Sequence, residues 1–222
     1  MKKLLKIFLP KKIRKNLRIF LKFIIYNYRY FKIKFAILHK QKIKIIVGAA
    51  ETYQNNWYST NQNWLDIRKE NHWKKIFKNK TIITNVVAEH VFEHLTYEEC
   101  IESLKTIHNY TTKDSKIRIA VPDGYNPDSN YIKNVKVKGI GDDAADHKQL
   151  LNKDILFEIL TKAQFKPKLI EGYDSNKRLY SEKYSIEEGF IKRSRQNNDT
   201  NLEKIWGFKD SKTSLIVDAT KI

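Results

Sequence analysis

The chain lacks two features that would point to common classes of secreted or membrane protein. It has one cysteine, Cys100, in 222 residues, so no disulfide can form within the chain. A lone thiol fits a reducing compartment, and we expect a cytoplasmic protein. No stretch reaches the roughly 20 mostly apolar residues of a spanning helix, because cations interrupt the longest apolar runs, at Lys22, Arg29, Lys32 and Lys34. Cations also run through the would-be apolar part of a signal peptide, so none is predicted.

Acidic residues are missing from the first part of the chain. Residues 1–44 hold 15 Lys and Arg and no Asp or Glu, whereas the remainder holds 28 basic and 25 acidic residues. The formal net charge of +18 therefore belongs to one segment and not to the globular part. We assign residues 1–40 to a basic amphipathic helical segment and residues 41–222 to one domain.

The basic segment has three interpretations. Between Ile13 and Phe35 it is expected to form one or two helices with a wide apolar face. Basic helices rich in Leu, Ile and aromatic residues lie in membrane interfaces and are attracted to anionic lipids. Alternatively the apolar face packs on the domain or on a partner subunit. Nucleic-acid binding needs the charge without so much exposed apolar surface, and it has the least support.

The rest of the chain alternates strand and helix patterns. Predicted helices cover Arg68–Phe77, Tyr97–Tyr110 and Asn152–Ala163. Predicted strands are Lys42–Val47, Trp57–Thr60, Trp64–Ile67, Ile82–Val87, Lys116–Val121, Pro167–Tyr173 and Thr213–Ala219. Such alternation is typical of an α/β fold with a mostly parallel sheet, covered by helices on both faces. The polar segment Asp174–Lys212 is expected to be irregular.

Polar residues crowd the end of one buried strand. The strand Ile82–Val87 is followed within seven residues by four titratable groups, Glu89, His90, Glu93 and His94. Ligands of open α/β sheets bind outside the carboxyl ends of the strands, so this polar elbow is the predicted centre of the chemistry. Thr96, followed by acidic residues, is expected to cap the next helix.

A literal zinc-peptidase pattern occurs in the same elbow. His90, Glu93 and His94 spell H-x-x-E-H, which needs both histidines on one helical face. His90 follows a strand directly and is expected in the turn, so we predict no peptidase and no metal site. Structural interpretations also exist, because His94 can pack the helix start and Glu93 can favour the helix N-terminus.

A long polar loop of about 28 residues follows the strand Lys116–Val121 and carries a second cluster, Asp142, Asp143, Asp146 and His147. If this loop folds back over the carboxyl edge of the sheet, His147 faces the elbow as a general base or substrate clamp. The alternative is a solvated acidic loop. Asp123 ends the strand before the loop, in a Pro-Asp-Gly turn whose chemistry alone can account for it.

The order of these pieces resembles the predicted S-adenosylmethionine-dependent methyltransferases of the class I, Rossmann-like superfamily, and most of all a bacterial branch associated with cell-surface saccharide biosynthesis. The resemblance spans roughly residues 42–219. It rests on a set of short motifs: VGAAET, WYSTN, LDI, AEHVFEHLT, RIAVPDGYNPD with a later YI, DDAADHKQL, AQF and SLIVDA.

The resemblance implies a role for each matching position. S-adenosylmethionine would be the cofactor, with its methionine part near the first turn, Gly48, Ala49 and Ala50. Asn61 stands where an acid usually holds the ribose, and Asp66 matches the acid near adenine. The turn Ala88, Glu89 and His90 would lie beside the cofactor, and the substrate side would be lined by Glu93, His94, Asp123 and His147.

The chain also departs from that pattern. The glycine-rich first loop is reduced to Gly48, and only 12 residues separate it from Asn61, so the first βα unit must be shortened. Three functions follow. The first is a methyltransferase acting on a saccharide or lipid-linked precursor at the inner membrane face. The second is a non-catalytic scaffold of the same fold, favoured by the single-glycine loop. The third is a nucleic-acid methyltransferase or binder, supported only by charge.

Overall fold

The computed structural model describes residues 10–39, 41–50, 52–141, 144–196 and 213–222. Seven strands form one sheet in the order β2-β1-β3-β4-β7-β5-β6. Their bounds are β1 Ile43–Val47, β2 Tyr58–Ser59, β3 Ile83–Glu89, β4 Thr111–Pro122, β5 Phe165–Tyr173, β6 Leu179–Ser181 and β7 Ser214–Lys221. The first four strands are parallel, and β7 runs antiparallel between β4 and β5. The predicted Rossmann-like, mostly parallel α/β sheet is confirmed.

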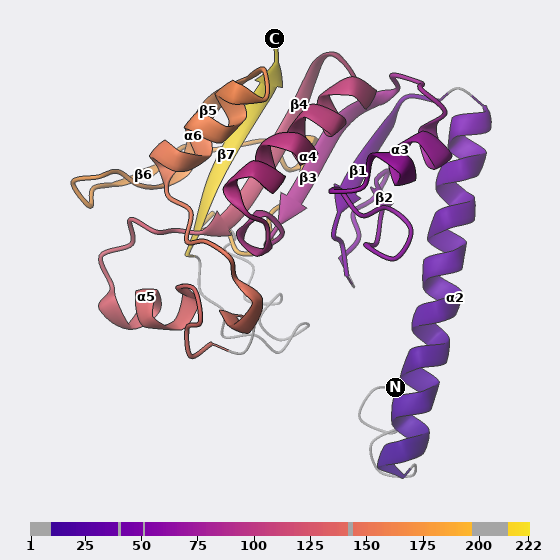
Figure 1. Ribbon diagram of the computed structural model, residues 1–222, viewed down its shortest axis with the longest axis horizontal. Helices are drawn as coiled ribbons and strands as arrows, with labels where there is room; N and C mark the ends of the chain where they lie inside the picture. Colours follow the sequence, from indigo (N-terminus) through magenta and orange to yellow (C-terminus); the bar gives the residue numbers. More distant parts are fainter. Residues whose placement is uncertain (1–9, 40, 51, 142–143, 197–212) are drawn as a thin grey trace.

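Four helices, α2, α3, α4 and α6, occupy the positions that the apolar spacing predicts, with small shifts at their ends, whereas the short α5 lies in the segment predicted as a polar loop (Figure 1). The α-helices are α2 Lys11–Leu38, α3 Glu70–Phe77, α4 Tyr97–Tyr110, α5 Ser129–Val135 and α6 Lys153–Lys162, and the 3-10 turns are η1 Phe92–His94, η2 Ala144–Asp146 and η3 Ile186–Glu188. Helix α4 begins as predicted: Thr96 Oγ1 accepts from the amide of Glu99, whose carboxylate accepts from the Thr96 amide. This reciprocal capping box satisfies two donors at the helix start.

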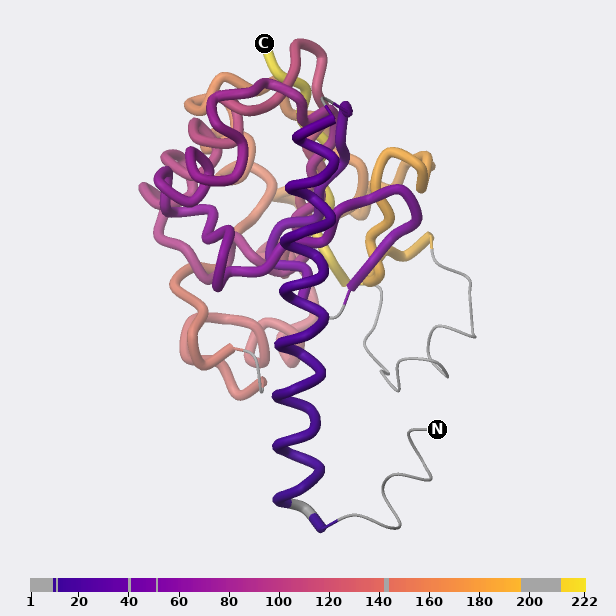
Figure 2. Tube along the Cα trace, turned by 90° about the vertical axis from the view of Figure 1, so that its right-hand side faces the viewer, coloured from indigo at the N-terminus to yellow at the C-terminus, as the bar shows by residue number. Residues whose placement is uncertain are grey.

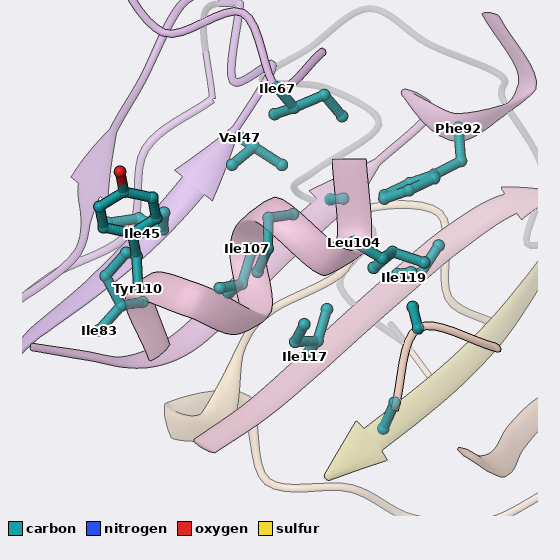
Figure 3. Packing of buried hydrophobic residues seen from close by; sticks show 14 of the residues in the cluster. Ile45, Val47, Ile67, Ile83, Phe92, Leu104, Ile107, Tyr110, Ile117 and Ile119 are labelled. Atoms are coloured by element: carbon teal, nitrogen blue, oxygen red, sulfur yellow. The ribbon is translucent and has the colours of Figure 1, made fainter. Parts of the chain in front are cut away.

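One face of the sheet carries the main hydrophobic core. Alternate residues of the central strands, such as Ile45, Val86 and Ile119, pack against buried residues of α3, α4 and α6. Figure 3 shows Leu104 and Ile107 of α4 lying over this face. Since strand side chains alternate between faces, the remaining strand residues point the other way.

The opposite face is covered differently from the prediction. Its apolar residues, among them Val87 and Ile216, pack on Trp57 and Ile191. In the part of the chain that the structure describes, this cover is irregular chain around η3, and α3, α4 and α6 all lie on the first face. The expectation of helices on both faces is therefore corrected to helices on one face and along the β2 edge.

The predicted strand Trp64–Ile67 is wrong. The amides of Trp64 and Leu65 both donate to the carbonyl of Asn61, which turns the chain directly after β2. Leu65 and Ile67 are buried in the main core without pairing to the sheet. A short apolar run can be buried as a turn, and its composition alone does not distinguish this from a strand.

Helix α2 is a single helix of 28 residues that stands along the β2 edge (Figures 1 and 2). Its last turns carry Ile33, Ala36 and Ile37 into the main core. Its first part extends beyond the sheet, on the side where β1 and β3 end. No helix within the described ranges is both long and apolar enough to cross a bilayer.

Candidate functional site

The candidate site lies where the order of strands reverses. Strand β1 pairs with β2 on one side and with β3 on the other, and all three are parallel. The chain therefore leaves β1 toward one side, returns, and continues on the other. In open α/β sheets ligands bind outside the carboxyl ends of the strands at such a reversal point. Gly48 follows β1, Asn61 follows β2, and Glu89 ends β3. The predicted convergence on one edge of the sheet is met at these three positions.

The first turn after β1 is tight and is filled by a side chain of the elbow between β3 and η1. Gly48 has φ +59°, and a Cβ added there would lie 2.6 Å from Val91 Cγ2. Ala49 is buried, and Ala50 adopts φ 44°. The glycine therefore gives room to Val91 of the elbow, so the space beside its Cα is not open. The first turn and the elbow touch across the reversal point.

An arginine of helix α2 covers the end of β2. Arg29 Nη1 donates to Asn61 Oδ1 at 3.2 Å and to the carbonyl of Ala50 at 2.8 Å, and Nη2 reaches the carbonyl of Thr52 at 3.3 Å. Asn61 is 5% exposed. The amide oxygen that the sequence assigns to a ribose hydroxyl is thus accepting a hydrogen bond from the chain itself.

Asp66 is also engaged within the protein. Arg68 binds it in a bidentate manner, with Nε 2.9 Å from Oδ1 and Nη2 2.7 Å from Oδ2. Burial raises the pKa of Asp66, but the hydrogen bonds and charge of Arg68 outweigh it and hold the pKa below the ordinary value. The carboxylate is charged and fixed at the rim of the site.

The polar end of β3 is covered from the irregular segment. Both carboxylate oxygens of Glu89 accept backbone amides, from Lys192 at 3.1 Å and from Arg193 at 2.9 Å. Ala88 is fully buried in the main core. Glu89 thus anchors the segment over the second face, while Ala88 faces the helices.

His90 makes the turn between β3 and η1, as the sequence predicts. Its φ is 54°, its amide donates to the carbonyl of Ala120, and Nε2 lies 3.3 Å from Ser214 Oγ. Nδ1 lies 2.8 Å from Glu93 Oε1. His90 is not on a helical face with His94, so the peptidase arrangement of the H-x-x-E-H pattern is absent.

Glu93 is almost completely buried at this edge, with 1% of its side chain exposed. Burial raises the pKa of this carboxyl, but the nearby His90 and His94 outweigh burial and hold the pKa below its usual range. Within the described residues neither carboxylate oxygen has a partner in hydrogen-bond geometry, although His90 is at ion-pair distance. A buried carboxylate without hydrogen bonds is costly and calls for an explanation.

The long loop folds back onto the elbow, which confirms that His147 faces His94. The two imidazole centroids are 4.9 Å apart, edge to face. The amide of Lys148 donates to the carbonyl of Glu93 at 2.9 Å and fixes the loop there. Asp146 Oδ1 lies 3.1 Å from His94 Nδ1. Of the predicted second cluster, Asp142 and Asp143 lie outside the described residues.

Asp123 is buried in a different set of contacts. Its Oδ1 accepts from the amide of Tyr125 at 3.0 Å, and its Oδ2 accepts from the amide of Tyr173 at 2.8 Å. Burial raises the pKa of this carboxyl. Asp123 ties the end of β4 to the end of β5, so its assignment to the substrate side has no support from its contacts.

Residues that the sequence did not single out hold the site together. Arg29, Val91 and the amides at 192–193 contact four of the predicted cofactor positions, Gly48, Ala50, Asn61 and Glu89. In the sequence Arg29 is one cation in a basic run, and nothing in its local context distinguishes it from its neighbours. Backbone amides carry no residue-type signal at all, so only the fold reveals them.

Comparisons with known proteins complete the description. No family model matches the chain, and no curated protein does either. Among solved structures, a SAM-dependent methyltransferase from Archaeoglobus fulgidus is 15% identical, covers 82% of this chain and 86% of its own, and has a TM-score of 0.46. A SAM-dependent methyltransferase from Thermotoga maritima is 9% identical, with coverages of 95% and 96% and a TM-score of 0.46.

A third likeness is to magnesium protoporphyrin IX methyltransferase from Synechocystis with bound SAH, 8% identical, with coverages of 89% and 83% and a TM-score of 0.41. With TM-scores below 0.5, these likenesses carry no argument about this chain. Its α/β fold rests on its own strand order, and its site on the contacts described above.

Proposed function

We propose that the protein is an S-adenosylmethionine-dependent methyltransferase. One observation carries the proposal: buried Asn61 after β2 and the elbow with Glu93, His94 and His147 lie on either side of one reversal point, at the same edge of a parallel sheet. That arrangement offers a hydrogen-bond acceptor for a nucleoside on one side and a cluster of polar side chains for an acceptor molecule on the other. The short motifs in the sequence point to the same activity.

The residues at this edge fit the nucleoside end of S-adenosylmethionine better than its methionine end. At the ribose end Asn61 Oδ1 accepts a hydrogen bond from Arg29, and a hydroxyl can take that place. At the methionine end the space beside Gly48 is filled by Val91. We therefore assign Asn61 and the adjacent rim residue Asp66 to the nucleoside. Arg29 has to release Asn61 when the nucleoside binds.

S-adenosylmethionine, once bound, supplies a methyl group already activated on sulfur. The protein's own task is then to orient the acceptor and exclude water. His94 is 30% exposed and is the member of the cluster that opens to solvent, whereas Glu93 and His147 lie behind it. We assign the acceptor to this side of the edge.

For the acceptor we propose a saccharide or lipid-linked molecule at an anionic membrane surface. Helix α2 has nine Lys and Arg and no acid. It also exposes Ile13, Phe20, Ile24, Phe31 and Phe35, which recur at intervals of four and seven residues and so share one face. Lipid is the occupant that complements both properties, since it offers negative charge and an apolar interior.

The position of the helix supports this acceptor. Arg29 contacts the first turn and Asn61, so it marks the level of the carboxyl edge. The 18 residues before it span about 27 Å at 1.5 Å per residue, and they extend past that edge (Figure 2). A membrane bound to this part of α2 would lie on the side of the sheet that holds the site.

Vesicle binding tests the membrane part of the proposal. The full chain should sediment with vesicles of phosphatidylglycerol and phosphatidylcholine but not with phosphatidylcholine alone. The double variant Phe20→Glu, Phe31→Glu should lose most of this binding, while the control Lys113→Glu, on β4, should retain it. Retention on RNA instead of vesicles, or a stable dimer that buries the helix, would contradict lipid as the occupant.

A second candidate function has a specific observation in its favour. Asn61, Asp66 and Glu89 are each bound by the chain's own groups, and Gly48 is covered by Val91. An edge closed in this way suits a non-catalytic protein of the same fold, acting as a scaffold at the membrane.

Calorimetry with S-adenosylhomocysteine separates the two functions. The methyltransferase should bind one molecule per chain, and Asn61→Leu should weaken binding at least tenfold by removing the acceptor of the ribose hydroxyl. Asn130→Leu, on exposed α5, is the matched control and should leave the affinity unchanged. Absence of heat at millimolar ligand, with the chain folded by circular dichroism, would favour the scaffold.

A further inference from the structure

The elbow after β3 and the loop after η2 together hold the donor set of a metal centre. Glu93, His94 and His147 each offer one ligand atom, and these atoms lie within 4.8 Å of one another. Two imidazoles and one carboxylate form the protein ligand set of catalytic zinc sites and of mononuclear iron(II) sites. We propose that a divalent transition-metal ion binds between these three side chains.

The unsatisfied state of Glu93 is the first argument. Its side chain is 1% exposed, and in the described part of the chain the contact of Oε1 with His90 Nδ1 at 2.8 Å falls outside hydrogen-bond geometry, as does any contact of Oε2. A buried carboxylate left in this way is strongly unfavourable unless a cation compensates it. The histidine nitrogen at 2.8 Å accounts for one oxygen at most, and among the described residues the second oxygen has no partner in hydrogen-bond geometry. A metal ion supplies the missing charge.

The tautomer of His147 is the second argument. Its Nδ1 lies 2.7 Å from the carbonyl of Val135. A carbonyl only accepts, so Nδ1 carries the proton and Nε2 keeps a free lone pair. Metal-bound histidines are held in this way, with the other ring nitrogen donating to a carbonyl or carboxylate. His147 is thus oriented as a ligand before any ion arrives.

His90 supports the carboxylate in a corresponding way. Its Nδ1 lies 2.8 Å from Glu93 Oε1, and its Nε2 lies 3.3 Å from Ser214 Oγ. With the proton on Nδ1, His90 steadies one oxygen of Glu93 and leaves the other for the ion. His90 is therefore a positioning residue and not a fourth ligand. The strained φ of 54° at His90 is what aims its ring back at Glu93.

The three ligands need only a small adjustment to close on an ion. Tetrahedral Zn²⁺ with bonds of about 2.0–2.1 Å holds its ligand atoms about 3.4 Å apart. The present separations of up to 4.8 Å therefore shorten by about 1.4 Å at most, which side-chain rotation can supply. The backbone is already tied, because the amide of Lys148 donates to the carbonyl of Glu93 at 2.9 Å.

The ion would retain an open coordination position toward solvent, on the side of His94, whose side chain is 30% exposed. With three protein ligands, Zn²⁺ takes a further oxygen from water or substrate. The role of the bound ion rests on the proposed methyl transfer. The ion would hold an oxygen of the acceptor molecule beside the methyl donor. The chemical class of acceptor is then a molecule with a hydroxyl or carboxylate that binds a divalent cation.

Calorimetric titration of Zn²⁺ into the metal-free, untagged full chain tests the site. One ion should bind per chain. Glu93→Gln keeps the volume of the side chain, and both it and His147→Gln should weaken binding by at least 100-fold. His39→Gln, an exposed histidine at the end of α2, is the control and should leave the dissociation constant unchanged. His90→Gln should cause an intermediate loss of about 10–100-fold, as expected for an outer partner.

Two results would overturn the inference: no binding of Zn²⁺ by the wild-type chain, or binding that Glu93→Gln and His147→Gln leave unchanged. Circular dichroism of each metal-free variant confirms that it is folded. A parallel titration of S-adenosylhomocysteine in the presence of EDTA keeps the two proposals apart. Cofactor binding without Zn²⁺ binding defeats the metal site alone, and Zn²⁺ binding without cofactor binding defeats the methyltransferase alone.

Discussion

Replacement of Arg118 by methionine should reveal what holds the irregular segment on the second face of the sheet. Arg118 is 2% exposed and forms two hydrogen bonds with Asp218, at 2.6 Å and 2.7 Å. Its Nη1 donates to the carbonyls of Ser185 and Gly189, and its guanidinium lies 4.1 Å from the ring centroid of Tyr184. One side chain therefore joins β4, β7 and the segment around η3.

The expected cost follows from these contacts. Removing one partner of a buried ion pair costs about 3–5 kcal/mol, because the other charge is left uncompensated. Asp218 retains 20% exposure, so water relieves part of that penalty, and the lower end of about 3 kcal/mol is expected. In a domain of this size 1 kcal/mol corresponds to about 2–4 °C in Tm, so Arg118→Met should lower Tm by about 6–12 °C.

The assay is thermal and urea unfolding of matched variants. Lys116 lies on β4 like Arg118, and its ion pair with Glu188 also reaches the segment around η3, but both side chains are over one-third exposed. Lys116→Met removes this exposed pair. It should cost less than about 1 kcal/mol. The double variant Arg118→Met, Asp218→Leu should be more stable than Arg118→Met alone, since no charge remains buried. A loss for Arg118→Met no greater than for Lys116→Met would refute this reasoning.

Three further predictions concern the edge that holds the site. Gly48→Ala should lower the free energy of unfolding by more than about 1 kcal/mol in urea unfolding, because φ is +59° and the new Cβ would meet Val91; an unchanged midpoint would contradict the geometry of this turn. Thr96→Ala should cost about 1 kcal/mol by the same assay through loss of the helix cap, and Thr96→Ser should restore most of it. Since pairing with Arg68 lowers the pKa of Asp66, its contribution to stability is present above its unfolded pKa of about 3.8 and is lost as pH falls through the lower folded value. The wild type should therefore lose more stability than Asp66→Asn between pH 5 and about pH 2, and equal acid profiles would show that the pair does not matter.

The elements that could be predicted from sequence are those with a local signal. Strand β3 is a run of β-branched residues that ends in polar ones, and α4 follows it with Thr96 as cap, so both were found within two residues of their observed ends. The fold-back of the long loop was one of two alternatives left open by the sequence, the other being a solvated acidic loop, and the structure shows the fold-back. Local propensity and a long-range chemical argument pointed to the same edge.

Other features depend on tertiary contacts that no local pattern encodes. Leu65 and Ile67 belong to the main hydrophobic core but lie in a turn, whereas their apolar run predicts a strand. The cover of the second face depends on Arg118 reaching the carbonyls of two distant residues. Arg29 resembles its cationic neighbours in α2, and only the packing of the helix on the β2 edge brings it to Asn61. Burial of isolated polar groups in this way is decided by the assembled fold.

The most direct test of the central claim is a crystal structure of the full chain with S-adenosylhomocysteine. The account predicts the nucleoside at the carboxyl edge beside β1 and β2, with a ribose hydroxyl on Asn61 Oδ1 in place of Arg29 and the sulfur toward Glu93 and His94. A ligand bound at the opposite edge of the sheet, or an edge still closed by Arg29 and Val91 at saturating ligand, would contradict it.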